Sequence, residues 1–84
     1  MRLCFRGKAW DQYMHWYETD KTQFKRINTL IKDIRRNPFA GIGMPEPLKH
    51  ELTGFWSRRI DLEHRLVYWV TETEIIIAQC RYHY

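Results

Sequence analysis

The chain has 84 residues, of which 14 are Lys or Arg and 10 are Asp or Glu, and its formal net charge is +4 at pH 7. A chain of this length builds one core and has no room for a second lobe, so residues 1–84 are expected to form a single domain. The positive charge favours an anionic partner, with nucleic acid as the leading candidate. Charged residues interrupt the N-terminal segment too early for a secretory signal or a membrane span, so a cytoplasmic protein with no membrane partner is expected.

The two cysteines, Cys4 and Cys80, lack the CxxC spacing that is typical of metal and redox sites. In a cytoplasmic protein they are expected to be reduced thiols buried in strands. The sequence therefore predicts no metal centre and no cofactor.

The first half of the chain predicts one strand and two helices. The apolar-rich run Arg2–Phe5 indicates an opening strand. Apolar residues then recur at the spacing of one helix face, and this stripe is expected to lie in the core: Ala9, Trp10, Tyr13, Met14 and Tyr17. A second helix begins after the N-cap signal Thr19-Asp20 and ends at Asn37-Pro38, because proline lacks the N–H that a helix needs. Its apolar stripe consists of Phe24, Ile27, Leu30, Ile31 and Ile34.

The second half predicts a long loop and an antiparallel meander. Residues 38–54 show no sustained period, and loops of that length are uncommon in compact domains unless they act as lids or binding surfaces. Three strand-like runs follow, over Trp56–Leu62, Arg65–Val70 and Glu74–Tyr82. The order β-α-α-β-β-β predicts an α+β fold, with two helices on one face of a mostly antiparallel sheet and the opposite face exposed.

Strand alternation predicts which side chains share the exposed face. With Leu66, Tyr68 and Val70 toward the helices, Arg65, Val67 and Trp69 point away from them. On the last strand, the same alternation is expected to bury Ile76, Ala78 and Cys80. The exposed face would also receive Arg59, Asp61, Gln79, Arg81 and His83, and a one-residue bulge would reverse part of this assignment.

The chemistry on that face fits RNA cleavage without a metal. Such a reaction needs a base for the ribose 2′-hydroxyl, cations for the phosphoryl oxygens, and an acid for the leaving 5′-oxygen. His83 suits the acid and Arg65 suits the charge clamp. Glu46, from the long loop, suits the base, although a carboxylate is weak in that role and low intrinsic activity is expected.

Several residues keep more than one interpretation. His15 is expected on the surface and His64 in a hairpin turn, and both are excluded from catalysis. His50 shares the long loop with Glu46 and could be a second acid or base. Glu63 either balances the charge of Arg59 or Arg65 or takes a direct part. Phe55 and Trp56 belong to the core, or Phe55 stacks on an RNA base.

Four segments of the chain resemble YoeB-type toxins of the RelE superfamily, which belong to bacterial type II toxin–antitoxin systems. They contain Pro45-Glu46-Pro47-Leu48-Lys49-His50, Gly54-Phe55-Trp56-Ser57-Arg58-Arg59-Ile60, Glu63-His64-Arg65-Leu66-Val67-Tyr68 and Cys80-Arg81-Tyr82-His83-Tyr84. The resemblance implies a microbial-ribonuclease-like fold and cleavage of messenger RNA in the A site of the 70S ribosome.

The resemblance also implies roles and partners. Glu46 would be the general base, His83 the general acid, Arg65 the phosphate stabiliser and Tyr84 an orienting or stacking group. The expected partners are mRNA, the ribosome, a YefM-like antitoxin and a second copy of the chain. The expected RNA-binding residues are Lys49, Arg58, Arg59, Glu63 and Arg81.

Two other functions stay open from the sequence. A superfamily relative could poison DNA gyrase without cutting RNA. A non-catalytic module could instead bind ribosomal RNA through the basic face of the second helix, where Lys25, Lys32 and Arg36 lie. A solvated face is the simpler explanation for those charges.

Overall fold

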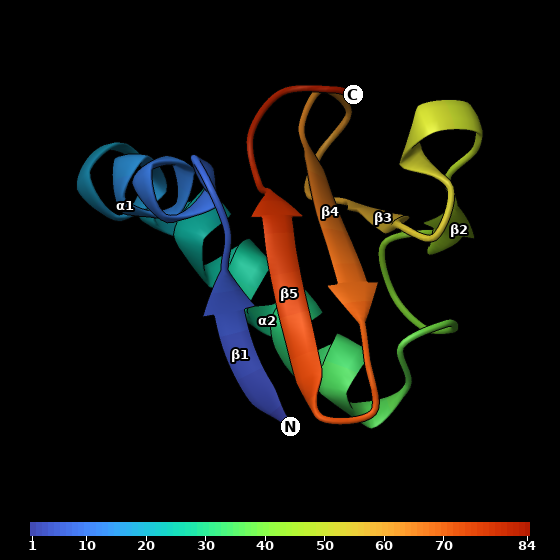
Figure 1. Ribbon diagram of the computed structural model, residues 1–84. Helices are drawn as coiled ribbons and strands as arrows, with labels where there is room; N and C mark the ends of the chain where they lie inside the picture. Colours follow the sequence, from blue (N-terminus) through green and yellow to red (C-terminus); the bar gives the residue numbers. More distant parts are fainter.

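The computed structural model describes all 84 residues and contains a five-stranded sheet with strand order β1-β5-β4-β3-β2 (Figure 1). Strand β1 runs parallel to β5, and the other neighbouring strands are antiparallel. The predicted α+β class and mostly antiparallel sheet are therefore confirmed. The elements are β1 (Arg2–Phe5), α1 (Ala9–Thr19), α2 (Lys21–Arg36), β2 (Glu46–Pro47), the 3-10 helix η1 (His50–Leu52), β3 (Trp56–Arg59), β4 (Arg65–Val70) and β5 (Glu74–Gln79).

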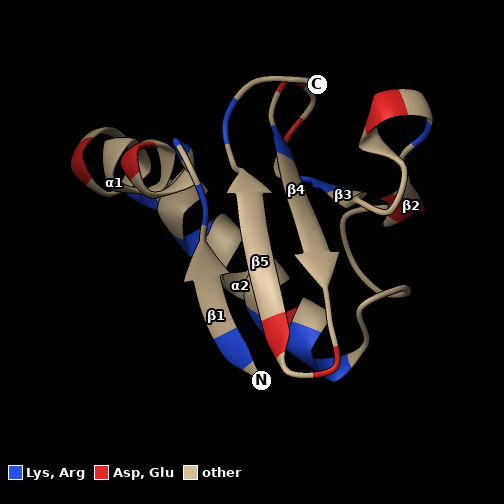
Figure 2. Cartoon of the chain, viewed as in Figure 1, with Lys and Arg blue, Asp and Glu red and all other residues tan.

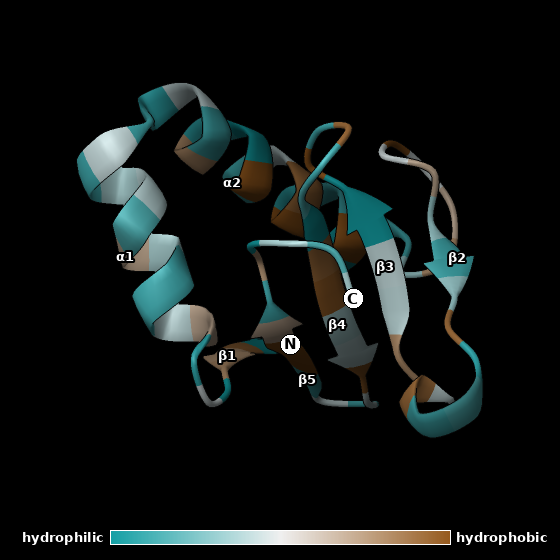
Figure 3. Cartoon of the chain, turned by 90° about the horizontal axis from the view of Figure 1, so that it is seen from above, coloured by the Kyte–Doolittle hydropathy of each residue, from teal (hydrophilic) through white to brown (hydrophobic).

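Helix α2 covers one face of the sheet and supplies much of the core, as its apolar stripe predicts. Hydrophobic residues gather between α2 and strands β4 and β5 (Figure 3). The Asp20 carboxylate caps the helix by accepting from the N–H groups of Thr22 and Gln23. The helix ends before Asn37-Pro38, as expected. The buried cluster includes Ile27, Leu30, Ile31 and Ile34 of α2 and Leu66, Tyr68, Ile75 and Ile77 of the sheet.

Helix α1 forms where it is predicted, but only part of its expected core stripe is buried: Ala9 belongs to the core cluster and Tyr13 packs against it. Trp10 and Tyr17 are 50% and 48% exposed, whereas the buried aromatic residue of α1 is Trp16. The Trp16 indole N–H donates to the carbonyl of Cys80 over 2.8 Å. The aromatic stripe lies beside the edge strand β1, where Tyr13 packs on Phe5, so much of it stays open to solvent.

The long segment after α2 contains a fifth strand that the sequence pattern does not predict. The two residues of β2 pair with β3, and η1 follows directly. Gly43 precedes β2 with φ +79°, and its carbonyl accepts from the N–H of Arg59. A side chain there would meet Leu30 at 2.8 Å, so the close approach of this segment to α2 requires glycine.

The meander is present, but two of its strands are shorter than expected and one has a bulge. Strand β3 stops at Arg59 and β5 at Gln79. Asp61, expected on the exposed face of β3, lies in the following turn and accepts from the N–H groups of Glu63 and His64. The extra residue of the bulge is Ala78 of β5: the consecutive residues Val67 and Tyr68 of β4 pair with Gln79 and Ile77, and Ala78 has no partner.

This bulge overturns part of the expected burial on β5. Ile75 and Ile77 are fully buried, whereas Ile76 and Ala78 are only partly buried, so the prediction that Ile76 and Ala78 point inward is wrong. Cys80, just after the strand, is buried as expected, and Cys4 is partly buried; both thiols are free. Burial raises the pKa of the Cys80 thiol to about 12.

Neither helix combines the length and the apolar composition that crossing a membrane requires.

Candidate active site on the sheet face opposite the helices

Strand register brings four predicted residues of interest to the sheet face opposite α2. Ser57 on β3 lies opposite Glu46 on β2 and opposite Val67 on β4, while Arg59 lies opposite Arg65. Directly opposed residues share a face, and so do alternate residues of one strand. Glu46, Arg59, Arg65 and Val67 therefore lie on one face, as predicted for the last three.

The last five residues, 80–84, form a tail that turns back over this face. The turn is at Tyr82, whose backbone is left-handed with φ 68°. The Tyr82 carbonyl accepts from the Arg65 N–H over 3.0 Å and from the Gln79 amide over 3.2 Å. The Tyr82 N–H donates to Nδ1 of His64 over 2.7 Å. The tail is thus fixed to the start of β4 and the turn before it.

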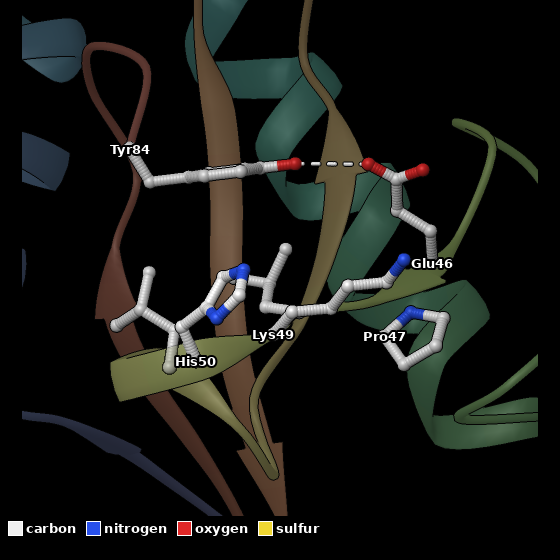
Figure 4. A pocket seen from close by; sticks show the side chains of 7 residues that line it. Glu46, Pro47, Lys49, His50 and Tyr84 are labelled. Atoms are coloured by element: carbon white, nitrogen blue, oxygen red, sulfur yellow. Dashed lines mark hydrogen bonds between the residues drawn. The ribbon is translucent and has the colours of Figure 1, made fainter.

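The end of the tail reaches Glu46. The Tyr84 hydroxyl donates to Oε1 of Glu46 over 2.9 Å (Figure 4). It also lies 3.3 Å from the Ser57 hydroxyl. A pocket of about 390 Å³ opens beside this contact, and Glu46, Lys49, His50 and Tyr84 surround it. The rest of its lining is Pro47, Leu48 and Leu52. Residues 38 positions apart in the sequence therefore share one site.

His83 adjoins this pocket but does not line it. Its ring packs against the ring of Tyr84 with centroids 4.6 Å apart and an interplanar angle of 34°. Its Nδ1 lies 3.0 Å from the Tyr84 carbonyl, and the residue is exposed. The imidazole is therefore open to a ligand approaching the tail.

Arg65 is largely buried, with 8% of its surface exposed. Its Nη1 donates to the carbonyls of Asp61 and His64 over 2.9 and 3.2 Å, so one arm of the guanidinium supports the turn. The other guanidinium nitrogens of Arg65 make no hydrogen bond within the protein. Arg59 is exposed beside it, and Figure 2 shows Lys and Arg on β3, at the start of β4 and on the tail. This face can therefore hold a phosphate near the tail.

Glu63 and Arg81 lie at the margin of the site. The Glu63 carboxylate is 3.6 Å from Nε2 of His64, and its side chain is mostly exposed, so of the two open interpretations the charge pairing with Arg59 or Arg65 is not found. The Arg81 guanidinium lies over the ring of Tyr82 at 4.6 Å and over that of Trp16 at 5.9 Å. Arg81 borders a second cavity together with Lys8, Asp11, Gln12 and Tyr82.

Arg58 does not belong to the site, and its expected contact with RNA is wrong. The residue is fully buried on the helix side of the sheet, where it forms a salt bridge with Asp33. Its guanidinium also donates to the Tyr68 hydroxyl and to three backbone carbonyls of residues 37–42. Hydrogen bonds from Arg36, the Ile42 N–H and Arg58 hold the pKa of Asp33 well below its ordinary value.

Sequence reasoning missed Ser57 and the second role of His64. Ser57 lies opposite Glu46 only because β2 forms, and no pattern in the long loop predicts that strand. His64 lies in the predicted turn, but its ring bonds the tail. The sequence signal for that contact is the concentration of chemically active residues in the tail. It indicates that the tail is held in place but does not identify His64 as the residue that holds it.

The site offers a carboxylate, a guanidinium, an imidazole and a phenol on one face. No group of three or more His, Cys, Asp or Glu side chains is placed to hold a metal ion. The arrangement provides acid, base and cationic groups of the kinds that phosphoryl transfer uses.

Comparison with known proteins gives consistent matches over the whole chain. Residues 5–84 match the family model of the YoeB-like toxin of bacterial type II toxin–antitoxin systems. The chain is 62% identical over 84 residues to toxin YoeB of Escherichia coli strain K12, and 100% of both chains is covered. The YoeB/ParE toxin from Agrobacterium tumefaciens superimposes with a TM-score of 0.97 at 46% identity, again with 100% of both chains covered.

Two solved structures of Staphylococcus aureus proteins extend the match. One is a heterotetrameric YoeB–YefM toxin–antitoxin complex, with a TM-score of 0.93, and the other is a YoeB dimer, with a TM-score of 0.94. Both are 48% identical to this chain and cover 100% of it and 98% of the matched chain. Sequence and fold agree from end to end, and the chain belongs to the YoeB-like toxin family of bacterial type II toxin–antitoxin systems.

Proposed function

We propose that this toxin is a metal-independent endoribonuclease that cleaves messenger RNA in the A site of the ribosome. The observation that carries the proposal is the hydrogen bond of the Tyr84 hydroxyl to Glu46. Through it, the tail that bears His83 lies beside a carboxylate on the face that also carries Arg65. Base, acid and cation come from three different segments of the chain, and the fold of the tail is what unites them.

In the proposed mechanism Glu46 takes the proton of the ribose 2′-hydroxyl, and the 2′-oxygen attacks the adjacent phosphorus. Arg65 stabilises the negative charge that develops on the phosphoryl oxygens, using the guanidinium nitrogens that the protein leaves free. His83 gives a proton to the 5′-oxygen as the bond from phosphorus to that oxygen breaks. The products are a 2′,3′-cyclic phosphate and a 5′-hydroxyl.

The remaining side chains of the face would bind and orient the substrate. Lys49 in the pocket and the exposed Arg59 would contact phosphates, and Tyr84 would leave Glu46 when the ribose enters and stack on a base. His50 lines the same pocket and would contact the nucleotide. Each of these contacts strengthens binding without taking a proton in the reaction.

The proposed partners follow from the same family. A YefM-type antitoxin would bind this toxin, because the S. aureus relative at 48% identity forms a heterotetrameric complex with YefM. A homodimer is proposed on the S. aureus dimer. An antitoxin segment that displaced Tyr84 from Glu46 would inactivate the site without unfolding it.

A reconstituted translation system with a defined message tests the proposal. Primer extension should find cleavage within the codon in the A site, and the new ends should be a cyclic phosphate and a 5′-hydroxyl. A 2′-deoxy substitution at the scissile nucleotide should abolish cleavage, and Glu46→Gln or His83→Ala should lower its rate by about 10² to 10⁴-fold.

Four results would contradict the proposal. Cleavage that persists at the 2′-deoxy nucleotide, or ends that carry a 5′-phosphate, would exclude attack by the 2′-hydroxyl. Growth arrest by Glu46→Gln without loss of messages would instead indicate a non-catalytic RNA-binding toxin, and DNA damage on expression would indicate a gyrase poison.

A further inference from the structure

His64 lies in the turn between β3 and β4, and its imidazole is enclosed by aromatic rings and the tail. The ring meets Trp16 edge to face at a centroid distance of 4.9 Å and lies 6.2 Å from the ring of Tyr82. Only 12% of its side chain is exposed. The proposed mechanism gives this buried, titratable group no task, although it sits directly behind the tail.

The hydrogen bond of the ring defines which nitrogen carries the proton. Nδ1 lies 2.7 Å from the backbone nitrogen of Tyr82, which can only donate. Nδ1 must therefore be the unprotonated acceptor, and a neutral ring then carries its proton on Nε2. Nε2 faces the Glu63 carboxylate at 3.6 Å, a neighbour that suits an N–H group.

The backbone conformation of Tyr82 depends on this hydrogen bond. Its φ of 68° is a conformation that non-glycine residues rarely adopt, so it persists only where surrounding contacts impose it. The carbonyl of Tyr82 is held by Arg65 and Gln79, and its N–H is held by His64 alone. Without His64 the peptide between Arg81 and Tyr82 loses the hydrogen bond that fixes its orientation.

We propose that His64 is a positioning residue, whose Nδ1 fixes the peptide of Tyr82 and thereby aims His83 and Tyr84 at the Glu46 pocket. The inference rests on the proposed ribonuclease function. The two residues that follow Tyr82 carry the proposed acid and the contact to Glu46, so a small rotation at Tyr82 moves both. Displacing a reacting group by about 1 Å can cost ~10²-fold in rate.

A purely structural role for the ring can be separated from this one, because the chain contains a matched histidine. His15 on α1 also meets Trp16 edge to face at 4.9 Å, but its ring makes no hydrogen bond to the tail. Replacing His15 with alanine therefore removes one imidazole contact of Trp16 and keeps the hydrogen bond between the Tyr82 N–H and His64.

The test compares four variants in single-turnover cleavage of a programmed ribosome: His64→Ala, His64→Asn, His64→Gln and His15→Ala. Asn places its amide oxygen about where Nδ1 lies, whereas the amide of Gln reaches the region of Nε2. We expect His64→Ala and His64→Gln to lower the cleavage rate at saturating toxin on the order of 10 to 10²-fold. The toxin concentration that gives half of the maximal rate should change by less than about threefold. His64→Asn should recover most of the rate, and His15→Ala should match the parent chain.

A second measurement needs no substitution. Nitrogen NMR of the histidine side chains in the intact protein should show that Nε2 of His64 carries the proton. It should also show that the unprotonated Nδ1 accepts the hydrogen bond of the Tyr82 N–H. A proton on Nδ1 would overturn the inference, as would full activity of His64→Ala or failure of Asn to exceed Gln. An inactive parent chain would instead contradict the proposed function, so the two failures are distinguishable.

Discussion

Arg58 and Arg59 are neighbours in the sequence and opposites in the structure. Arg58 points to the helix side of the sheet, where it is fully buried and bonded to Asp33, Tyr68 and three carbonyls. Arg59 points to the other face and is exposed beside Arg65. The same residue type thus holds the fold on one side of a single sheet and is available to an anion on the other.

The contrast extends to the two faces as wholes. The helix-side face holds the apolar cluster and the contacts of Arg58 with residues 37–42, and it determines stability. The opposite face holds Glu46, Arg65 and the tail, which is attached through a few hydrogen bonds. Substitutions should therefore separate into those that unfold the protein and those that inactivate it.

The sharpest test of this separation is Arg58→Ala against Arg59→Ala. Removing Arg58 leaves Asp33 without its buried partner and three carbonyls without a donor, so the free energy of unfolding should fall by about 3–5 kcal/mol. Arg59→Ala should change it by less than about 0.5 kcal/mol, as surface substitutions usually do. Urea unfolding followed by circular dichroism measures both. Equal losses for the two variants would mean that the sheet does not divide in this way.

Acid unfolding probes the same buried contact by pH. The pKa of Asp33 is depressed in the folded state, so its contribution to stability is present above the unfolded value of ~3.9 and is lost as the pH falls below it. Asp33→Asn should lower stability at pH 7 and reduce the proton uptake on acid unfolding by about one proton. Asp11→Asn, which removes an exposed carboxylate from α1, serves as the control. If Asp33→Asn unfolded in acid with the same pH dependence as the parent chain, the stabilising role assigned to the Asp33 carboxylate would be contradicted.

On the opposite face, Tyr84→Phe should have a small effect on activity and almost none on stability. The substitution removes the hydroxyl that bonds Glu46 and Ser57 but keeps the ring that would stack on a base. Because Tyr84 is proposed to leave Glu46 when the ribose enters, its hydroxyl aligns the tail only before binding, and its loss should cost no more than one hydrogen bond of about 0.5–1.5 kcal/mol; cleavage should therefore slow by at most roughly tenfold. Primer extension gives the rate and thermal melting the stability. A loss beyond 10²-fold would indicate that the hydroxyl itself takes part in proton transfer.

The sequence predicts well where local signals and burial agree. Helix α2 has a clear stripe, an Asp20 cap and a proline stop, and it forms within those limits. Arg65 and Val67 take the predicted face because β4 pairs regularly with β3 and the extra residue of the bulge lies in β5. The proposed site residues Glu46 and Tyr84 lie together, although the sequence alone places them by resemblance rather than by geometry.

The failures have physical causes that a pattern does not contain. The stripe of α1 resembles that of a core helix, but the helix lies at the sheet edge, so it buries Ala9 and Trp16 and leaves Trp10 and Tyr17 exposed. One bulge opposite Val67 and Tyr68 shifts the alternation of β5. Arg58 has the appearance of an RNA contact in the sequence, and its burial is explained by partners that lie 10 to 25 positions away: the Asp33 carboxylate, the Tyr68 hydroxyl and three backbone carbonyls.

The turn at Tyr82 has a practical consequence for anyone who extends this polypeptide. The chain termini lie at opposite ends of the sheet, and the carboxyl end emerges beside the pocket, whereas the amino end is remote from it (Figure 1). A purification handle or fluorescent fusion joined after Tyr84 would start at the mouth of the cavity and obstruct an incoming strand. The same cargo joined before Met1 would leave that approach clear.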